Sequence, residues 1–197
     1  MKGDKAMKNP IVFIDQLANP NPDKVEEEYG NIKDPNAAKR FGVRIYEEYS
    51  YWSWRSCAIA NVAMILATEG KLRESLYALV CEALLMDGYA YKNLRGAVDV
   101  GWKHSILCKL LEKRGFKTSV LSHLSLKEVQ RLLREGKYVV LSIRSESGGH
   151  MVLVKEVNES TVLYNDPYSF KNKGGEDVEE AISTFSGKFL GRGIATW

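Results

Sequence analysis

Hydrophobic residues recur every three to four positions through the middle of the chain, and from about residue 138 they gather in short strand-like runs. A spacing of three to four residues places apolar side chains on one face of an α-helix. Serines suited to N-caps begin two of these stretches, and a glycine lies at or just after the end of each stretch. The pattern predicts helices over residues 56–70, 72–86, 104–113 and 125–136.

Stretches rich in β-branched residues predict strands. The run at 150–157 and the next run at 161–165 are separated by Asn-Glu-Ser, a turn sequence that joins them into an antiparallel hairpin. Further strands are expected over 42–46, 138–143 and 189–196, and one further helix over 177–185. Because most helices precede most strands, the order predicts an α+β fold with an antiparallel sheet.

Residues 1–40 differ from the rest of the chain in being polar and rich in proline, which interrupts helices. Within this segment, residues 11–14 favour one short strand and residues 23–29 one short helix. We expect residues 1–40 to be an N-terminal extension that packs on the core, and residues 41–197 to form the domain itself.

The composition is that of an ordinary globular domain, with 197 residues of which 45% are hydrophobic. The net charge of +3 is small and spread along the chain, so no nucleic-acid partner is expected. The first apolar run, Ile11 to Ile14, is too short for a secretory signal or a membrane span. Three cysteines without framework spacing argue against a disulfide scaffold and for the reducing cytoplasm.

Cys57 stands in the first turn of the predicted helix 56–70, where unpaired backbone amides and the helix dipole favour a thiolate over a thiol. A cysteine in this position is a candidate nucleophile, although a lone cysteine is most often a small buried hydrophobic residue. His104 and Cys108 share a helix face and would supply half of a metal site. Since no second pair completes that half-site, no metal and no cofactor is expected.

His150 opens the predicted strand 150–157 and follows two glycines, Gly148 and Gly149, which let a substrate or another backbone approach closely. Asp166 ends the next strand, so the predicted hairpin returns its carboxylate beside the imidazole. There the carboxylate is expected to accept the Nδ1 proton of His150 and orient the ring. Asn165 is the competing orienter, because successive strand residues face opposite ways and only one of the two can reach.

Each of these residues also has a purely structural interpretation, but their order along the chain is informative. A cysteine at a helix start, a histidine on a strand and an acid on the neighbouring strand follow one another as in papain-like enzymes. In these residues the chain resembles the bacteriocin-leader-processing peptidases, papain-like enzymes that remove double-glycine leaders, and their stand-alone relatives. The matching pieces are Trp54-Arg55-Ser56-Cys57-Ala58-Ile59-Ala60, Ala63-Met64-Ile65-Leu66, Gly101-Trp102-Lys103-His104, residues 132–143, Gly149-His150-Met151-Val152-Leu153-Val154 and Asn165-Asp166-Pro167.

The resemblance implies a papain-like fold with a helical N-terminal lobe and an antiparallel-sheet C-terminal lobe. It also implies that Cys57 is the nucleophile, His150 the general base and acid, and Asp166 the orienting group of a thiol hydrolase that cleaves a peptide or amide bond. The family usually carries a glutamine six residues before the cysteine, whose side-chain amide helps to form the oxyanion hole. In this chain that position is Tyr51, and Ala58 stands where relatives often have glycine.

Six residues near the expected site are candidates for completing the oxyanion hole or for binding substrate: Tyr51, Ser53, Trp54, Arg55, Gly149 and Asn165. Two further functions stay open. One is a thiol acyltransferase on the same fold, in which an amine replaces water in resolving the acyl-enzyme. The other is a non-catalytic peptide-binding module, which the tyrosine at position 51 favours. If Tyr51 limits the reaction, Tyr51→Gln is expected to raise turnover.

Overall fold

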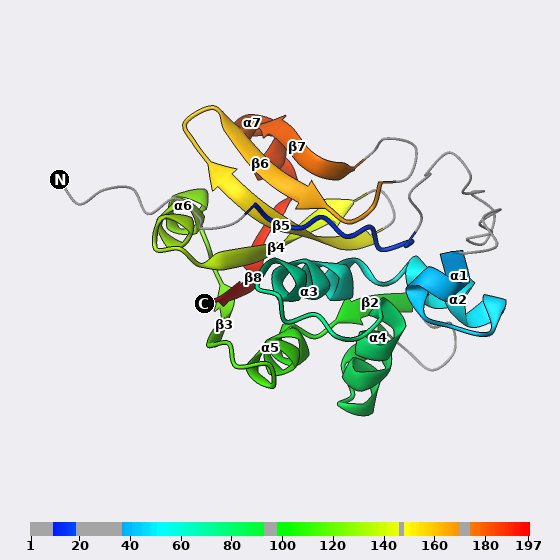
Figure 1. Ribbon diagram of the computed structural model, residues 1–197. Helices are drawn as coiled ribbons and strands as arrows, with labels where there is room; N and C mark the ends of the chain where they lie inside the picture. The colour runs from blue at the N-terminus through cyan, green and yellow to red at the C-terminus, as the bar shows by residue number, and fades with distance from the viewer. Residues whose placement is uncertain (1–9, 19–36, 93–97, 146–147, 170–173) are drawn as a thin grey trace.

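The computed structural model describes residues 10–18, 37–92, 98–145, 148–169 and 174–197, which form a six-stranded sheet with helices on both faces and a separate two-stranded sheet (Figure 1). The helices are α1 (Ala37–Phe41), α2 (Tyr46–Ser53), α3 (Cys57–Thr68), α4 (Leu76–Leu85), α5 (His104–Glu112), α6 (Leu126–Arg134) and α7 (Ile182–Lys188). The strands are β1 (Tyr89–Lys92), β2 (Val98–Trp102), β3 (Thr118–Ser122), β4 (Tyr138–Ser145), β5 (Gly148–Val157), β6 (Thr161–Asp166), β7 (Gly175–Ala181) and β8 (Phe189–Thr196).

The larger sheet has the strand order β3-β8-β4-β5-β6-β7, and every neighbouring pair is antiparallel. The predicted hairpin of 150–157 and 161–165 is confirmed as β5 and β6, with Leu153 opposite Asn165. Its turn is held by Asn158, whose Oδ1 accepts hydrogen bonds from the backbone N–H groups of Ser160 (2.9 Å) and Thr161 (2.7 Å). Side-chain capping of this kind is why Asn is favoured in such turns.

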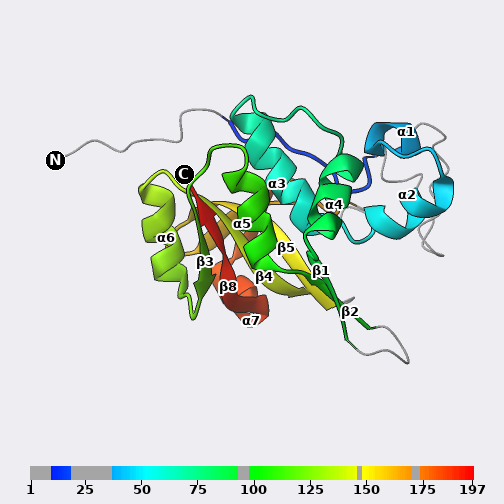
Figure 2. The same ribbon diagram turned by 90° about the horizontal axis from the view of Figure 1, so that it is seen from below.

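Two apolar layers cover the two faces of the sheet, because successive strand residues point to opposite sides. Met151 and Leu153 of β5 belong to the cluster shared with α3, α4 and α5, whereas Val152 and Val154 belong to the cluster shared with α6 and α7. Helices α3 and α5 therefore lie on one face, and α6 and α7 on the other, as Figures 1 and 2 show. Among the described residues, no helix has the length and apolar character needed to cross a bilayer.

Residues 10–18, called the N-terminal segment below, have no regular secondary structure but are built into the helical layer. Ile11 is 2% exposed, and Leu17 is fully buried among the residues of the α3 side. The Val12 N–H donates to Thr68 Oγ1 at the end of α3 (3.0 Å), and the Tyr49 hydroxyl donates to the Leu17 carbonyl (2.5 Å). The segment is the dark blue trace that runs across the strands, above α3, in Figure 1.

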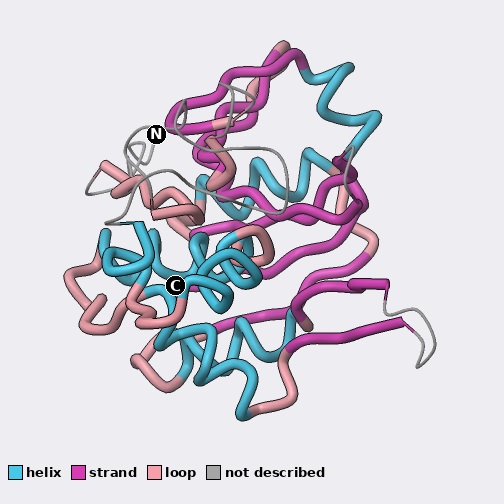
Figure 3. Tube along the Cα trace, turned by 90° about the vertical axis from the view of Figure 1, so that its right-hand side faces the viewer, coloured by secondary structure: helices cyan, strands magenta, loops and turns pink. Residues whose placement is uncertain are grey.

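Strands β1 and β2 pair only with each other and project beside the helical layer, as Figures 2 and 3 show. The base of this hairpin is tied to the chain just before α3, because Trp102 Nε1 donates to the Arg55 carbonyl (2.6 Å). The rings of Tyr89, Trp102 and Trp52 pack edge to face or tilted at this base. The hairpin and α2 therefore support each other next to the start of α3.

Three of the predicted helices agree closely with the structure, since α3, α5 and α6 begin and end near the expected residues. The capping box of α6 is present in full, with Ser125 and Glu128 each bonding the other's backbone. The helix predicted over 72–86 begins later, as α4 at Leu76, because Ser75 accepts the Ala78 N–H and acts as its N-cap.

Three predicted elements are wrong. Residues 42–46 are not a strand, since α2 begins at Tyr46 and is held by Tyr49, which is fully buried against Phe41 (ring centroids 5.4 Å apart). Residues 177–185 are not one helix, because Gly175–Ala181 pairs with β6 as a strand before α7 begins. The segment 11–14 is not a strand, although Ile11 is buried, and the helix predicted over 23–29 lies outside the described residues.

Candidate active site

Cys57 is the first residue of α3, a helix whose residues are almost all buried, so its backbone is held firmly by the core. Ser56 occupies the N-cap position, but its hydroxyl does not cap the helix: it turns back to donate to the Trp52 carbonyl (2.6 Å). The first-turn N–H groups of α3 are consequently left without that partner, beside the Cys57 thiol. A positive helix end of this kind stabilises a thiolate.

His150 lies at the start of β5 and Asp166 at the end of β6, and His150 Nε2 is 2.6 Å from Asp166 Oδ1. Both side chains are about nine-tenths buried, at 12% and 11% exposed. The same carboxylate oxygen accepts the Tyr168 backbone N–H (2.9 Å), which fixes the acid in place. Gly174 packs so closely on Asp166 that a Cβ there would stand 2.7 Å from its Cγ.

The bonded nitrogen differs from the one predicted, since Asp166 binds Nε2 of His150 rather than Nδ1. The ring therefore has its Nδ1 left for Cys57. Burial on its own would lower the pKa of His150, but the charge of Cys57, the hydrogen bonds to Asp166 and Cys57 and the charge of Asp166 together raise that pKa to about 10. With this pKa the His150 imidazole carries a proton at neutral pH, and its Nε2 donates a hydrogen bond to Asp166.

The site lies where the helical layer meets the sheet, and the aromatic ring of Tyr168 covers it. The rings of Tyr168 and His150 meet edge to face with centroids 6.4 Å apart, and Tyr168 also packs on Trp54 at 5.6 Å. Trp54 precedes Cys57 and Tyr168 follows Asp166, so this contact joins the two chain segments that carry the cysteine and the aspartate. Apolar cover of this kind keeps water from the His150–Asp166 hydrogen bond.

Comparison with known proteins identifies the fold. No family model and no curated protein matches the sequence. Among solved structures, a Bacillus anthracis protein described as a C39-like peptidase is 16% identical, with a TM-score of 0.61 and coverage of 99% of this chain and 98% of that one. The peptidase domain of Streptococcus ComA, described as a bifunctional ABC transporter involved in a quorum-sensing pathway, is 15% identical, with a TM-score of 0.50 and coverage of 73% and 90%.

The chain has the papain-like peptidase fold. The predicted α+β class is confirmed, with a helical N-terminal lobe, the cysteine at a helix start and an antiparallel sheet in the C-terminal lobe. The predicted resemblance to this group of peptidases is likewise confirmed at the level of the fold.

Asn165 and Asp166 face opposite sides of β6 in this fold. Asn165 is fully buried on the α3 side, where its Nδ2 lies 3.8 Å from Met64 Sδ and its Oδ1 accepts the Asp177 N–H (3.1 Å). Asp166 alone meets the imidazole. Gly149 is exposed, and nothing lies within 4 Å of where its Cβ would be, which leaves open space beside His150.

The side chain of Tyr51 is engaged on the side of the β1–β2 hairpin. It is 39% exposed, its hydroxyl lies 3.3 Å from the Tyr91 hydroxyl, and the Arg55 guanidinium stacks 3.9 Å over its ring. Arg55 also donates to the Tyr51 carbonyl (2.9 Å). Ser53 is fully buried, and its hydroxyl has no hydrogen-bond partner among the described residues.

Gln16, which the sequence analysis did not propose, lies against the chain that leads into Cys57. Its side chain is 2% exposed, and its Nε2 donates to the carbonyls of Ser53 (3.0 Å) and Trp54 (3.3 Å). Its backbone N–H donates to the Pro167 carbonyl (2.9 Å), next to Asp166. Gln16 thus bridges the approach to the cysteine and the segment after the acid. The available signal was a glutamine two residues after an apolar run in a segment otherwise dominated by proline and charge.

Metal ligation is not supported at the pair His104 and Cys108. His104 Nε2 lies 2.8 Å from Ser142 Oγ, and burial lowers the pKa of His104, with the charge of Arg192 acting in the same direction. Burial also raises the pKa of the Cys108 thiol. Within the ranges that the structure describes, no three His, Cys, Asp or Glu side chains are grouped for a metal ion.

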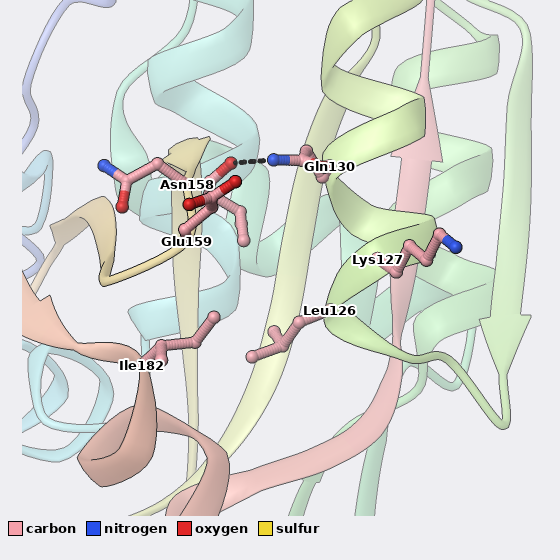
Figure 4. A pocket seen from close by; sticks show the side chains of 7 residues that line it. Leu126, Lys127, Gln130, Asn158, Glu159 and Ile182 are labelled. Carbon is pink, nitrogen blue, oxygen red and sulfur yellow. Dashed lines mark hydrogen bonds between the residues drawn. The ribbon is translucent and has the colours of Figure 1, made fainter.

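One pocket, of about 190 Å³, is shown in Figure 4. Its lining comes from α6, the turn between β5 and β6, and the first residue of α7: Leu126, Lys127, Gln130, Val157, Asn158, Glu159 and Ile182. The dashed line in Figure 4 is the bond from Gln130 Nε2 to the Val157 carbonyl (2.8 Å), which closes one side. Cys57 and His150 are not among the lining residues.

Proposed function

We propose that this protein is a thiol hydrolase that cleaves a peptide or amide bond through a Cys57–His150–Asp166 mechanism. The observation that supports the proposal best is the imidazole of His150, which is bonded to Asp166 through Nε2 and is coupled to the thiol of Cys57 at a helix start. Such a reaction needs a thiolate as nucleophile, an imidazolium as proton donor and a carboxylate that orients the imidazolium.

In the first half of the reaction, the Cys57 sulfur attacks the carbonyl carbon of the substrate. A C–S bond forms, and the carbonyl electron pair moves to the oxygen. The imidazolium of His150 then gives its proton to the amide nitrogen, the C–N bond breaks and the amine leaves. In the second half, neutral His150 takes a proton from water, the resulting hydroxide attacks the thioester, and the C–S bond breaks to release the acid and restore the ion pair.

The oxyanion needs hydrogen-bond donors where the charge develops. The backbone N–H of Cys57 is one donor, and we propose that the side-chain amide of Gln16 is the second. The bond from Gln16 Nε2 to Trp54, at 3.3 Å, is the longer of its two and is the one that a substrate oxygen would replace. Gln16 lies far upstream of Cys57 in the sequence. In this proposal the N-terminal segment supplies the side-chain oxyanion donor that the family has at the position of Tyr51.

This assignment removes the reason for favouring a non-catalytic peptide-binding module, since that alternative rested on the absence of a glutamine. Hydrolysis and acyl transfer share every step up to the acyl-enzyme, and the open side at Gly149 admits either water or an amine. Hydrolysis is proposed here because water is present at every exposed site and needs no dedicated binding pocket.

A covalent probe that mimics a peptide, such as a peptidyl vinyl sulfone, tests the proposal. We expect Cys57 to be labelled in the wild type, with labelling abolished in Cys57→Ala and strongly reduced in His150→Ala. Cys81→Ala is the matched control, because this cysteine lies in the interior of α4 and is expected to leave labelling unchanged. Labelling that survives in Cys57→Ala would contradict the proposed function.

A further inference from the structure

Asn61 is a fully buried polar residue in the largely apolar helix α3, one turn after Cys57. Its Nδ2 donates two hydrogen bonds, one to the Cys57 carbonyl (2.9 Å) and one to the Met151 carbonyl (2.8 Å). Cys57 and Met151 belong to different layers of the fold, since one begins α3 and the other follows His150 in β5. A single amide group thus ties the residue that carries the thiol to the neighbour of the histidine.

The orientation of this amide follows from its surroundings. Turning the amide over would place its oxygen against two carbonyl oxygens, so both protons of Nδ2 are required where the structure has them. The oxygen of the amide, Asn61 Oδ1, is buried without a hydrogen-bond partner among the described residues. A buried acceptor left unpaired costs about 1–3 kcal/mol. The unpaired oxygen of Asn61 therefore destabilises the fold, and the two bonds donated by Nδ2 are the favourable contribution of this side chain.

Apolar packing alone does not set the distance between a thiol and an imidazole, because it is not directional. Helix α3 and strand β5 contact each other, and both contribute residues, Met64 and Leu153 among them, to one apolar cluster. Two hydrogen bonds to main-chain carbonyls are directional, and they fix the start of α3 along β5. A displacement of about 1 Å between reacting groups can lower a rate by about 100-fold.

We propose that Asn61 is a positioning residue that sets the distance between Cys57 and His150 through its bond to the Met151 carbonyl. This inference rests on the function proposed above and adds a residue that neither touches the substrate nor takes part in the proton transfers. Without the bond to Met151, the sulfur and the imidazole separate, and the ion pair between them weakens.

Two variants separate the two bonds. Asn61→Leu keeps a similar volume and loses both bonds. Asn61→Ser retains one of them, because a helical serine hydroxyl donates to the carbonyl four residues earlier, which is that of Cys57, and it is too short to reach Met151. Thr68→Val is the matched control, since Thr68 is a buried polar residue at the far end of the same helix, where it donates to the Met64 carbonyl (2.8 Å).

The rate of Cys57 alkylation by iodoacetamide is measured against pH for the wild type, for these variants and for His150→Ala, together with kcat and KM on a peptide that the wild type cleaves. In Asn61→Ser we expect alkylation at pH 6 to fall toward the His150→Ala value and kcat to fall about 10- to 100-fold, with KM within about twofold. Thr68→Val is expected to lower the melting temperature and to keep the wild-type pH profile. Asn61→Leu should resemble Asn61→Ser in its pH profile. If Asn61→Leu fails to fold, Asn61→Ser still tests the role of the bond to the Met151 carbonyl.

A wild-type pH profile in Asn61→Ser would overturn the inference, because the bond to Met151 would then not control the pair. The same change of profile in Thr68→Val would also overturn it, since the effect would come from destabilising α3 in general. Alkylation of the wild type that does not depend on His150 would instead contradict the proposed function itself, and this inference with it.

Discussion

His150 Nε2 lies 2.6 Å from Asp166 Oδ1, on the opposite side of β6 from Asn165. The hairpin of β5 and β6 brings histidine and acid together, and the alternation of side chains along β6 decides which of two neighbouring residues meets the ring. The nitrogen that bonds the acid then determines which nitrogen of the ring is left for the thiol. With Nε2 held by the acid, Nδ1 is the atom that serves Cys57.

Asp166→Ala is expected to lower kcat more than Asn165→Ala, because only Asp166 orients the imidazole. We expect a loss of about 100-fold or more for Asp166→Ala, since a misoriented imidazole loses part of a general acid–base contribution of about 100- to 10,000-fold. Asn165→Ala is expected to act on folding instead, lowering the free energy of unfolding by about 1–3 kcal/mol, since it truncates a fully buried side chain and leaves the part-buried Asp177 N–H without its acceptor. Steady-state kinetics and urea unfolding of both variants check this. A larger loss of kcat in Asn165→Ala would refute the geometry.

Gln16→Ala is expected to lower kcat about 100- to 1000-fold, the usual effect of removing one oxyanion donor. Tyr51→Phe is the matched control, because it removes only a hydroxyl that lies beside Tyr91. The sequence alone led us to expect that Tyr51→Gln would raise turnover, and the position of Gln16 reverses this expectation to no increase. Kinetic parameters of the three variants test the assignment. A gain of activity in Tyr51→Gln would contradict this assignment and indicate that the side chain at position 51 donates to the oxyanion.

Turnover is expected to fall at high pH as His150 loses its proton, in a step near pH 10. The imidazolium is the protonated form, so it is present below its pKa of about 10 and lost above it, and with it the proton for the leaving amine. Cys57 is the largest of the groups that raise this pKa, so Cys57→Ser should lower it. NMR titration of His150 in the wild type and in Cys57→Ser measures the change directly. An equal pKa in both proteins would show that the two side chains do not interact.

Asp15, in the N-terminal segment, gives a pH dependence of stability. Burial raises its pKa to about 7, opposed by the bond from the Leu17 N–H and assisted by the charge of Asp166. Because the folded state binds this proton more tightly than the unfolded chain does, stability is greatest below the unfolded pKa of about 4 and falls as pH rises to about 7.

Asp15→Asn removes this ionisation while its side-chain oxygen can still accept the Leu17 N–H. We expect the variant to be more stable than the wild type at pH 8, by on the order of 1–3 kcal/mol, with the difference disappearing near pH 4. Chemical unfolding at the two pH values measures it. A variant that is less stable than the wild type at pH 8 would mean that the carboxylate form is favoured in the fold.

Much of the core of this fold could be predicted from local patterns. The helix that starts at Cys57 has a continuous apolar run and a glycine at its end, and the β5–β6 hairpin has two β-rich runs around a turn. These elements are specified by their own residues. By contrast, Gly175–Ala181 carries four acidic residues that suit a helix, and only its pairing with β6 makes it a strand.

The parts of the site that could not be predicted depend on contacts between distant segments. Nothing near Gln16 in the sequence indicates Ser53 or Trp54, whose carbonyls it bonds. Likewise, Asn61 could be placed on α3 from the pattern, but its bond to Met151 spans 90 residues. The order of cysteine, histidine and acid was visible in the sequence, whereas the choice of Nε2 over Nδ1 depends on how the hairpin presents the ring.

The most direct test of the whole account is competitive alkylation at neutral pH followed by mass mapping of the three cysteines, in the wild type and in His150→Ala. Cys57 combines a helix start with a histidine partner, whereas Cys81 is within α4 and Cys108 is buried with a raised pKa. We predict that Cys57 is modified far faster than the other two, and that this preference is lost in His150→Ala. Preferential modification of Cys81 or Cys108 in the folded wild type, or a Cys57 rate that does not depend on His150, would contradict the account.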